Sequence, residues 1–335
     1  MSKTNIRALA MQLGLSQGTV SKALKDSYEI SAATKKRVMA AAKKLNYVPN
    51  AYASSLRKKK SKTIAVVLPE VADSFFSVAI NGIESIAQQK GYHVLIYLTH
   101  ENFAKEKAIL NELKSGRVDG VLLSVTRETK NSKHIFDLQT SGVPVVLFDR
   151  VLEEIKTAKV CTNDFDSSYI AAKHLIERGC TKIAYLSISK NLAIANERLE
   201  GYKKAVRECG LLFEKNFLVA CNNSENYNYA VIKKLLCSSN RPNGILVSVE
   251  KLIITTYQVC NALQLKIPDD VKVAGFSIFP SASILNPPIT TICQPAFEIG
   301  ETATSLLFKI LEKRGVELEN KKIVLPSTLI VRSST

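Results

Sequence analysis

From residue 63 onward, short apolar runs alternate with amphipathic stretches, and this alternation limits the fold more than any other feature of the chain. The apolar runs predict strands at residues 64–68, 94–98, 120–123, 145–148, 183–186, 245–247 and 271–274. Helical spacing lies between them, for example at residues 78–89 and 198–208. The pattern indicates an α/β core of doubly wound parallel sheets with helices on both faces.

The length of this region, residues 62–335, is enough for two such sheets. We expect one subdomain to comprise residues 62–162 with 293–325, and the other to comprise residues 163–292 with 326–335. The chain then crosses between the subdomains three times. Because ligands of open α/β sheets bind at the carboxyl ends of the strands, the cleft between the subdomains is the predicted ligand site.

The first 62 residues differ from the rest because they hold most of the positive charge. They contain 14 Lys and Arg against two acids, which gives about +12 of the +16 net charge of the chain. The remaining residues are close to neutral, at about +4. A small cationic module attached to a larger region of nearly zero net charge favours a polyanionic partner, and nucleic acid is the leading candidate.

Residues 1–48 have the spacing of a helix-turn-helix head. Apolar residues at positions 6, 9, 10 and 13 predict a short amphipathic helix, and Gly14 supplies a turn position. Ser16 is the expected N-cap of a second helix, with its hydroxyl accepting from the amide of residue 18 or 19. A third helix is predicted to begin after Ser31 and to end near Asn46.

In this motif the amino end of the second helix enters a major groove. Gln17 and Lys22 carry groups that hydrogen-bond base edges. Hydroxyl groups near helix starts suit phosphate contacts, and the candidates are Thr4, Ser16, Thr19, Ser21, Ser31 and Thr34. The alternative is a three-helix bundle whose basic face docks another protein.

Residues 49–61 form the predicted hinge and basic linker. Residues 49–57 favour a helix of about two turns, which is below the ~12–15 residues that an isolated helix needs in water. A lysine-rich run follows at residues 58–62. We expect this segment to fold on DNA, with Leu56 as an apolar wedge in the minor groove beside Arg57, and with Asn50 and Ala53 in the same contact. The alternative is a flexible charged linker.

Several other protein classes are disfavoured. No apolar run approaches the ~18–20 residues of a membrane span, and the amino terminus is too polar for a secretory signal. Seven scattered cysteines and four histidines show no metal-ligand spacing, so we expect reduced thiols, a cytoplasmic protein, and no cofactor or metal. Nucleotide-binding, hydrolase and metalloprotease motifs are absent, which argues against an enzyme. A solute-binding protein for transport, the remote alternative, has no use for a basic head.

The segment TNIRALAMQLGLSQGTVSKALKDSYEISAATKKRVMAAAKKLNYVPNAYASSLR closely resembles the head and hinge of the lactose/galactose repressor family. The similarity continues through GVPVVLFDR, HLIERGCTKIAYL, IPDDVKVAGF and VLPSTLIVRSST, and therefore covers essentially the whole chain. It implies a dimeric transcription regulator whose core resembles periplasmic sugar-binding proteins. By resemblance, Gln17, Gly18 and Lys22 fall on base-reading positions, and Leu56 falls on the leucine wedge. Gly18 is smaller than the usual residue there, so no operator sequence follows.

Candidate effector contacts are the polar and aromatic residues after strand ends: Phe75, Phe76, Asp149, Arg150, Asp164, Arg198, Asn223, Glu250 and Ser277. Resemblance places Asp149 and Arg198 on frequent effector contacts, and the two phenylalanines on an aromatic wall. The family commonly has Asn-Asp where this chain has Val249-Glu250, and an Asp where it has Ser277, so no particular sugar follows. The alternatives are structural: aromatic core packing, a local Asp149–Arg150 ion pair, and a hydrogen bond from Arg198 to the strand ends.

We therefore expect a sequence-specific DNA-binding transcription regulator rather than an enzyme. The favoured form is a dimeric repressor whose operator affinity is controlled by a small polar metabolite, such as a sugar or sugar derivative, bound in the core cleft. Its expected partners are a pseudo-palindromic duplex operator, that effector and a second copy of the chain, with no membrane. A co-repressor-dependent regulator and an activator are the alternatives within this class.

Overall fold

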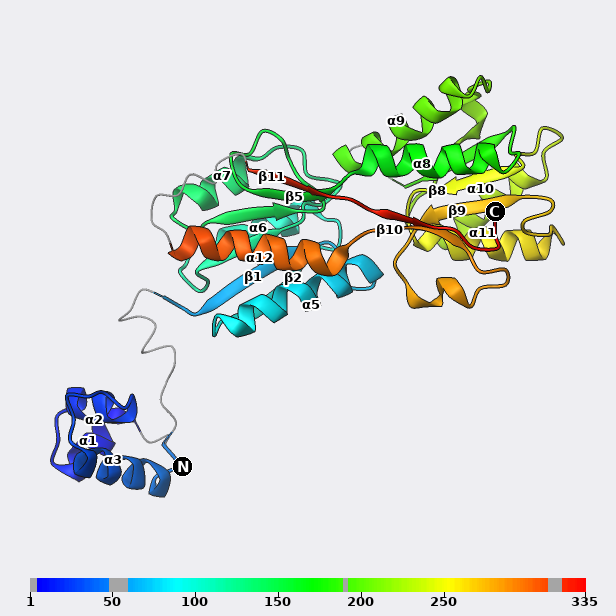
Figure 1. Ribbon diagram of the computed structural model, residues 1–335. Coiled ribbons are helices and arrows are strands. Elements are labelled where there is room, and N and C mark those ends of the chain that lie inside the picture. The colour runs from blue at the N-terminus through cyan, green and yellow to red at the C-terminus, as the bar shows by residue number, and fades with distance from the viewer. Residues whose placement is uncertain (1–4, 48–59, 189–191, 313–320) are drawn as a thin grey trace. The chain divides into compact units, whose positions relative to one another are not determined.

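The computed structural model describes residues 5–47, 60–188, 192–312 and 321–335, which belong to two compact units, Met1–Lys59 and Lys60–Thr335. The first unit is helical and the second is an α/β core (Figure 1), so the predicted fold class is confirmed. Among the described residues, no helix is long and apolar enough to cross a membrane.

The head consists of α1 (Ile6–Leu13), α2 (Gln17–Leu24) and α3 (Ala32–Lys44). Asn5 caps α1 by accepting a hydrogen bond from Ala8 N at 2.9 Å, and Gly14 ends it in the left-handed conformation at φ 63°. The three helices enclose a small core made of Leu9, Ala10, Val20, Ala23, Val38 and Ala42. Tight capping and this core fix the short helices, which are each too short to be stable alone.

The first sheet of the core has six parallel strands in the order β11-β5-β4-β3-β1-β2. They are β1 (Thr63–Leu68), β2 (His93–Leu98), β3 (Gly120–Leu123), β4 (Val145–Phe148), β5 (Lys159–Thr162) and β11 (Lys322–Leu325). The helices are α5 (Ser74–Gln89) and α12 (Ala296–Glu312) on one face, and α6 (Phe103–Leu113) and α7 (Lys133–Thr140) on the other.

Both faces of this sheet are buried, which explains its continuous apolar strands. Along β1, Ile64 and Val66 pack toward α5 and α12, whereas Ala65 and Val67 pack toward α6 and α7. The α5–α12 contact is close because a Cβ on Gly82 would lie 2.1 Å from a backbone oxygen of α12. This tight sandwich holds the carboxyl ends of the strands in fixed positions.

The second sheet repeats the design in the order β12-β10-β9-β8-β6-β7. Its strands are β6 (Ile183–Ser187), β7 (Leu218–Ala220), β8 (Gly244–Val247), β9 (Lys272–Phe276), β10 (Thr290–Cys293) and β12 (Thr328–Ile330). Helices α8 (Asp164–Glu177) and α9 (Ala193–Glu208) cover one face, and α10 (Glu225–Leu236) and α11 (Lys251–Ala262) the other. Strand β12 is the exception to the parallel pairing of this sheet: it pairs antiparallel with β10, because the chain crosses directly from β11 into it.

The predicted strands are all present, with ends that differ by at most two residues. Strands β5, β7, β10, β11 and β12 are additional to the predicted ones; β7 and β12 have only three residues, and β11 and β12 alternate in exposure at the sheet edges. Helices α5 and α9 begin earlier than predicted, at Ser74 and Ala193. Phe75 therefore lies inside a helix, and Arg198 lies in the second turn of α9 rather than at a helix start.

Three segments connect the two sheets, between β5 and α8, between β10 and α12, and between β11 and β12, as Figure 1 shows. Hydrogen bonds tie the segments together. Gln294 Nε2 donates to Thr162 Oγ1 at 3.2 Å, and Ser327 N donates to Asn163 Oδ1 at 2.8 Å. The three crossing segments are thus hydrogen-bonded to one another and do not connect the subdomains independently.

Candidate functional site

The amino end of α2 forms an exposed surface on the head. Gln17, Gly18 and Lys22 are exposed and Ser21 is half-buried, while Val20 on the opposite side of the helix is fully buried. Ser16 caps the helix by accepting from Thr19 N at 3.0 Å, which identifies the cap partner among the two that the sequence allowed. The helix start therefore presents backbone amides and small polar side chains on one face, as an anion-binding helix terminus does.

Hydroxyl groups at the helix starts already have partners within the head. Ser16 and Thr19 share a hydrogen bond of 2.9 Å between their hydroxyls, and the Ser31 hydroxyl donates to Thr34 Oγ1 at 3.0 Å. Lys22 is bound by the Glu29 carboxylate, which the sequence did not predict. The cation that the sequence predicts as base-reading is therefore in an intramolecular ion pair.

Five of the sequence-predicted residues lie outside the described residues: Thr4, Asn50, Ala53, Leu56 and Arg57.

The core contains a cavity of about 510 Å³ at the carboxyl ends of both sheets. Its walls come from both subdomains, with Phe75, Asp149 and Arg150 from the first and Arg198, Glu250 and Ser277 from the second. A cavity of this size, with mostly apolar walls and a few convergent polar groups, has the form of a small-molecule site. Asn223, which the sequence placed in this site, is not among the lining residues.

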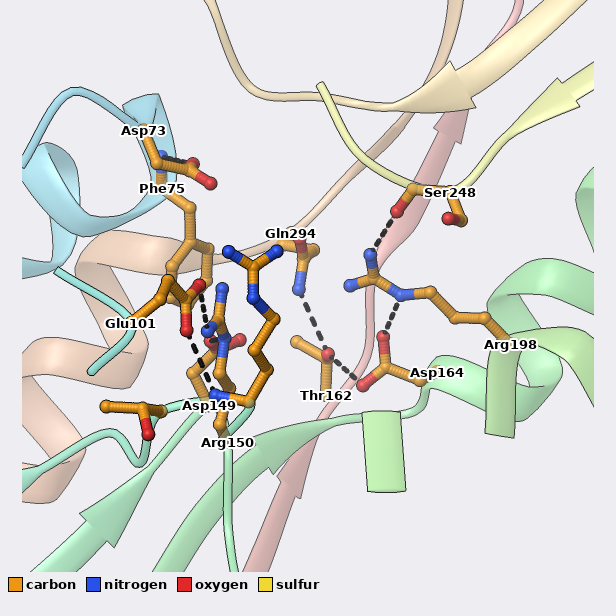
Figure 2. Close-up of polar contacts among 12 residues, drawn as sticks. Asp73, Phe75, Glu101, Asp149, Arg150, Thr162, Asp164, Arg198, Ser248 and Gln294 are labelled. Atoms are coloured by element: carbon orange, nitrogen blue, oxygen red, sulfur yellow. Dashed lines mark hydrogen bonds and ion pairs between the residues drawn. The ribbon is translucent and has the colours of Figure 1, made fainter. Parts of the chain in front are cut away.

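Arg198 is held by a chain of polar contacts that Figure 2 shows. Its Nε donates to Asp164 Oδ1 at 2.6 Å, and its Nη1 donates to the Ser248 carbonyl at 2.6 Å. The guanidinium carbon lies 3.9 Å from the ring centroid of Phe276. Thr162 Oγ1 donates to Asp164 Oδ2 at 2.8 Å and extends the chain to the crossing segments. Arg198 is thus fixed by a buried ion pair. Two of its nitrogens make structural hydrogen bonds, as one of the alternatives from the sequence proposes, and its side chain also lines the cavity.

Asp149 occupies a strained position beside the cavity. Its φ of 58° is in the left-handed region, and its amide donates to the Val160 carbonyl at 2.8 Å. The side chain is 8% exposed, and its closest cation is Arg150, at 3.9 Å between Nε and Oδ2. Burial raises the pKa of Asp149 to about 7, against the opposing attraction of Arg150. Its carboxyl group accepts no hydrogen bond among the described residues and is open to the cavity.

The guanidinium of Arg150 is directed to a different carboxylate. Its Nη1 donates to Glu101 Oε1 at 2.8 Å, and the Arg127 amide donates to Glu101 Oε2 at 3.0 Å. Burial opposes ionisation, but the Arg150 charge and these hydrogen bonds hold the pKa of Glu101 below its usual value. The predicted Asp149–Arg150 pair is therefore secondary to the Arg150–Glu101 pair, because Glu101 reaches the guanidinium at a shorter distance.

The Glu250 carboxylate accepts hydrogen bonds from both subdomains. Its Oε2 accepts from Ser277 Oγ at 2.6 Å and from the Ile278 and Phe279 amides at 3.1 and 3.2 Å. Its Oε1 accepts from the Ser74 hydroxyl of α5 at 2.5 Å. Glu250 and Ser277 therefore bind each other, and Ser74 is a cleft residue that the sequence did not single out.

The two phenylalanines have different surroundings. Phe76 is 2% exposed and packs edge to face against Phe148, with ring centroids 6.4 Å apart. Phe75, 7% exposed, contacts Phe76 in the same geometry at 5.4 Å. Both line the cavity, but most of their surface lies in the core of the first subdomain. Both phenylalanines thus pack in the core of the first subdomain and also form part of the cavity wall.

Arg127 and Lys251 are cavity residues that the sequence analysis did not identify. Arg127 lies on the loop after β3, and Lys251 is the first residue of α11. Arg127 Nη1 and Lys251 Nζ both donate to Asn223 Oδ1, at 3.1 and 2.9 Å. The signal in the sequence is their position, because each lies four residues after the end of a predicted strand.

Comparison with known proteins agrees with both the helical head and the α/β core. Residues 5–50 match the lacI family of bacterial regulatory proteins, and residues 172–335 match the periplasmic binding protein-like domain. The ribose operon repressor of Halalkalibacterium halodurans is 30% identical over 99% of this chain and 97% of its own length. The transcriptional regulator RegA of Clostridium saccharobutylicum is 31% identical over 99% of both chains. The structure of the lac repressor dimer bound to operator and the anti-inducer ONPF aligns with a TM-score of 0.85 over 99% of both chains, at 22% identity.

Proposed function

Because the chain belongs to the lacI family of bacterial regulatory proteins, we propose that it is a dimeric, cytoplasmic repressor of transcription whose operator affinity is set by a small polar metabolite. The observation that carries the proposal is the combination of an exposed α2 start on a basic head with a cavity walled by both subdomains. A regulator needs both parts, one to bind DNA and one to sense a ligand.

The head binds DNA through α2. Gln17, Gly18 and Lys22 meet base edges in the major groove, and the hydroxyl residues Thr4, Ser16, Thr19, Ser21, Ser31 and Thr34 contact phosphates. Exposure of the first group and the capping roles of Ser16 and Ser31 support this division. Since Lys22 is paired with Glu29, its ammonium group must leave the Glu29 carboxylate to contact a base edge when the head binds DNA.

Three functional segments follow from this proposal. Residues 1–48 are the DNA-binding head, residues 49–61 the hinge, and residues 62–335 the effector-binding and dimerisation core. Two heads read the half-sites of a pseudo-palindrome, while Asn50, Ala53, Leu56 and Arg57 of each hinge occupy the central minor groove. Ligand binding changes the angle between the subdomains and so the positions of the two hinges.

The effector binds in the cleft against Phe75, Phe76, Asp149, Arg198, Glu250 and Ser277. The open carboxyl group of Asp149 supports hydroxyl-bearing ligands, because it has acceptor capacity that no described residue uses. The relative named for the ribose operon supports a sugar or a sugar derivative. Of the other predicted contacts, Arg150 and Asp164 act through their ion pairs with Glu101 and Arg198, and Asn223 acts at the rim through Arg127 and Lys251.

The test is enrichment of bound duplexes from a random pool, with full-length protein at near-physiological salt. We expect a pseudo-palindrome with a flexible central step, and we expect Lys22→Ala to relax the preference at one position of each half-site. A loss of affinity that is equal for all sequences would make Lys22 a phosphate contact. Featureless enrichment by the unmodified protein would contradict sequence-specific repression.

A further inference from the structure

Two cations from opposite subdomains meet at the rim of the cleft on one neutral oxygen. Arg127 Nη1 lies 3.1 Å and Lys251 Nζ 2.9 Å from Asn223 Oδ1. Within the described parts of the chain, neither cation has a carboxylate oxygen within 4.0 Å, unlike Arg150 and Arg198, which are each paired with an acid. Both cations line the cavity. The two like charges therefore repel each other across the cleft without a counter-ion in contact.

The backbone adds to this positive field. Lys251 is the first residue of α11, where the helix dipole favours an anion over a cation; the N-cap residue Glu250 makes no side-chain cap hydrogen bond, and no acid lies in the first turn. The acids nearest in effect are Glu70, Glu101 and Asp73. Glu70 also lines the cavity but has no oxygen within 4.0 Å of either cation, Glu101 is already bound by Arg150, and the Asp73 carboxylate caps α5 through the Phe75 amide at 3.0 Å. Lys251 is exposed at the rim, and partial desolvation together with Arg127 lowers its pKa despite these acids.

The loop that carries Arg127 is held rigidly. Buried Glu106 accepts hydrogen bonds from Thr126 N at 2.7 Å and from Thr129 Oγ1 at 2.9 Å, and it contacts His134 Nε2 at 2.7 Å. The Arg127 amide is bound separately to Glu101. The guanidinium is therefore presented from a fixed backbone, as a preorganised binding group is.

We propose that Arg127 and Lys251 form a subsite for the phosphate group of the effector, so that the ligand is a phosphorylated sugar or a similar phosphate monoester. This inference rests on the proposed function, since it names the class of ligand that occupies the regulatory cleft. A phosphate dianion matches two cations and a helix start, and its oxygens take over the hydrogen bonds that Asn223 now accepts. The rest of the ligand extends toward Asp149, whose carboxyl group is open to hydroxyls.

The geometry also explains how such a ligand closes the cleft. Arg127 belongs to the first subdomain, and Lys251 belongs to the second. An anion held by both cations replaces repulsion between the subdomains by two attractive contacts, and this differential effect is what a ligand needs to shift a conformational equilibrium. A neutral sugar makes no such change at the rim.

The first experiment uses inorganic phosphate as the probe and full-length protein. Thermal unfolding is followed while phosphate replaces chloride at constant ionic strength and pH 7.5, for the unmodified protein, Arg127→Gln, Lys251→Gln and the control Lys233→Gln. Lys233 is exposed on α10 and lies away from the cavity, so it removes one charge without touching the subsite. We expect phosphate to raise the Tm of the unmodified protein and the control, and to have little effect on either rim variant.

Without phosphate, Lys251→Gln should have an unchanged or higher Tm, because it removes a repulsion. Hexose and pentose phosphates are then compared with their neutral parent sugars, and for any phosphate ester that binds, each rim substitution should weaken affinity at least about tenfold. Equal phosphate protection of all four proteins, or none in the unmodified protein, would overturn the subsite. Neither readout involves DNA, so failure here is distinct from failure to select an operator.

Discussion

The Ser74 hydroxyl and the Glu250 carboxylate join the two subdomains directly, with Ser74 Oγ donating to Glu250 Oε1 at 2.5 Å. The carboxylate is anchored on its own side by Ser277 and two backbone amides. Glutamate suits this place because a single carboxylate serves both subdomains at once. This hydrogen bond therefore favours the closed arrangement of the cleft.

Ser74→Ala should loosen this closure while leaving the remaining partners of Glu250 in place. One hydrogen bond to a charged acceptor is worth ~1–3 kcal/mol, so we expect a loss of that size in the free energy of unfolding and a larger radius of gyration in solution scattering. A double-mutant cycle with Glu250→Gln isolates the pair. Additive effects of the two substitutions would show that the contact contributes nothing to closure.

Asp149 should make the stability of the protein depend on pH. Its pKa is about 7 in the folded protein, above the ~3.9 of an unfolded chain, so the folded state binds the proton more tightly. The free energy of unfolding therefore falls as pH rises from ~4 to ~7, and this contribution is constant above that range. Asp149→Asn should remove this dependence and be more stable than the unmodified protein at pH 8 by up to ~4 kcal/mol.

Asparagine is a suitable replacement because it tolerates the left-handed conformation that residue 149 adopts. Urea unfolding at pH 5 and pH 8 measures the difference, with Asp269→Asn as an exposed control. If the two variants show the same change with pH, Asp149 is ionised in the folded protein throughout this range.

Arg198→Ala should lower the free energy of unfolding of the second subdomain, and this loss must be measured before any effect on ligand binding is interpreted. The substitution leaves the 2%-exposed Asp164 carboxylate without its cation, which typically costs ~3–5 kcal/mol. The double variant Arg198→Met/Asp164→Asn should recover much of this loss, because no buried charge remains. Chemical denaturation of the two variants measures the difference. Equal stability of both would argue against the ion pair as the structural role of Arg198.

Glu29→Gln should release Lys22 from its intramolecular partner. It also removes one of the two acids of the head, so we expect tighter binding to operator and non-specific duplexes and a steeper fall of affinity with salt. Titrations of both duplexes at two salt concentrations provide the measurement. Glu298→Gln, an exposed substitution in the core, is the control, and a similar gain in that variant would mean that only net charge matters.

Leu56→Ala tests the hinge, which lies outside the described residues. An apolar wedge that opens a base step acts only on a site that can be bent, so the substitution should sharply weaken operator binding and leave non-specific binding nearly unchanged. Binding to the selected operator and to a random duplex gives the comparison. Unchanged operator affinity would exclude the wedge role.

Much of the architecture follows from local sequence signals. The continuous apolar run of β1 and the capping residues Ser16 and Ser31 fix elements whose type and place depend only on neighbouring residues. Short edge strands such as β12 lack such a signal, because their pairing depends on a strand distant in sequence. The direction of β12 follows from its pairing with β10, which only the tertiary structure shows.

The sequence alone determined the class of site and the residues at the strand ends, because parallel sheets place those ends together. Only the tertiary structure decided their partners: Asp164 for Arg198, Ser74 for Glu250, and both Arg127 and Lys251 for Asn223. These partners come from elements as much as 176 residues apart. Such distances are set by how two separately folded sheets face each other, and no local pattern in a sequence encodes that arrangement.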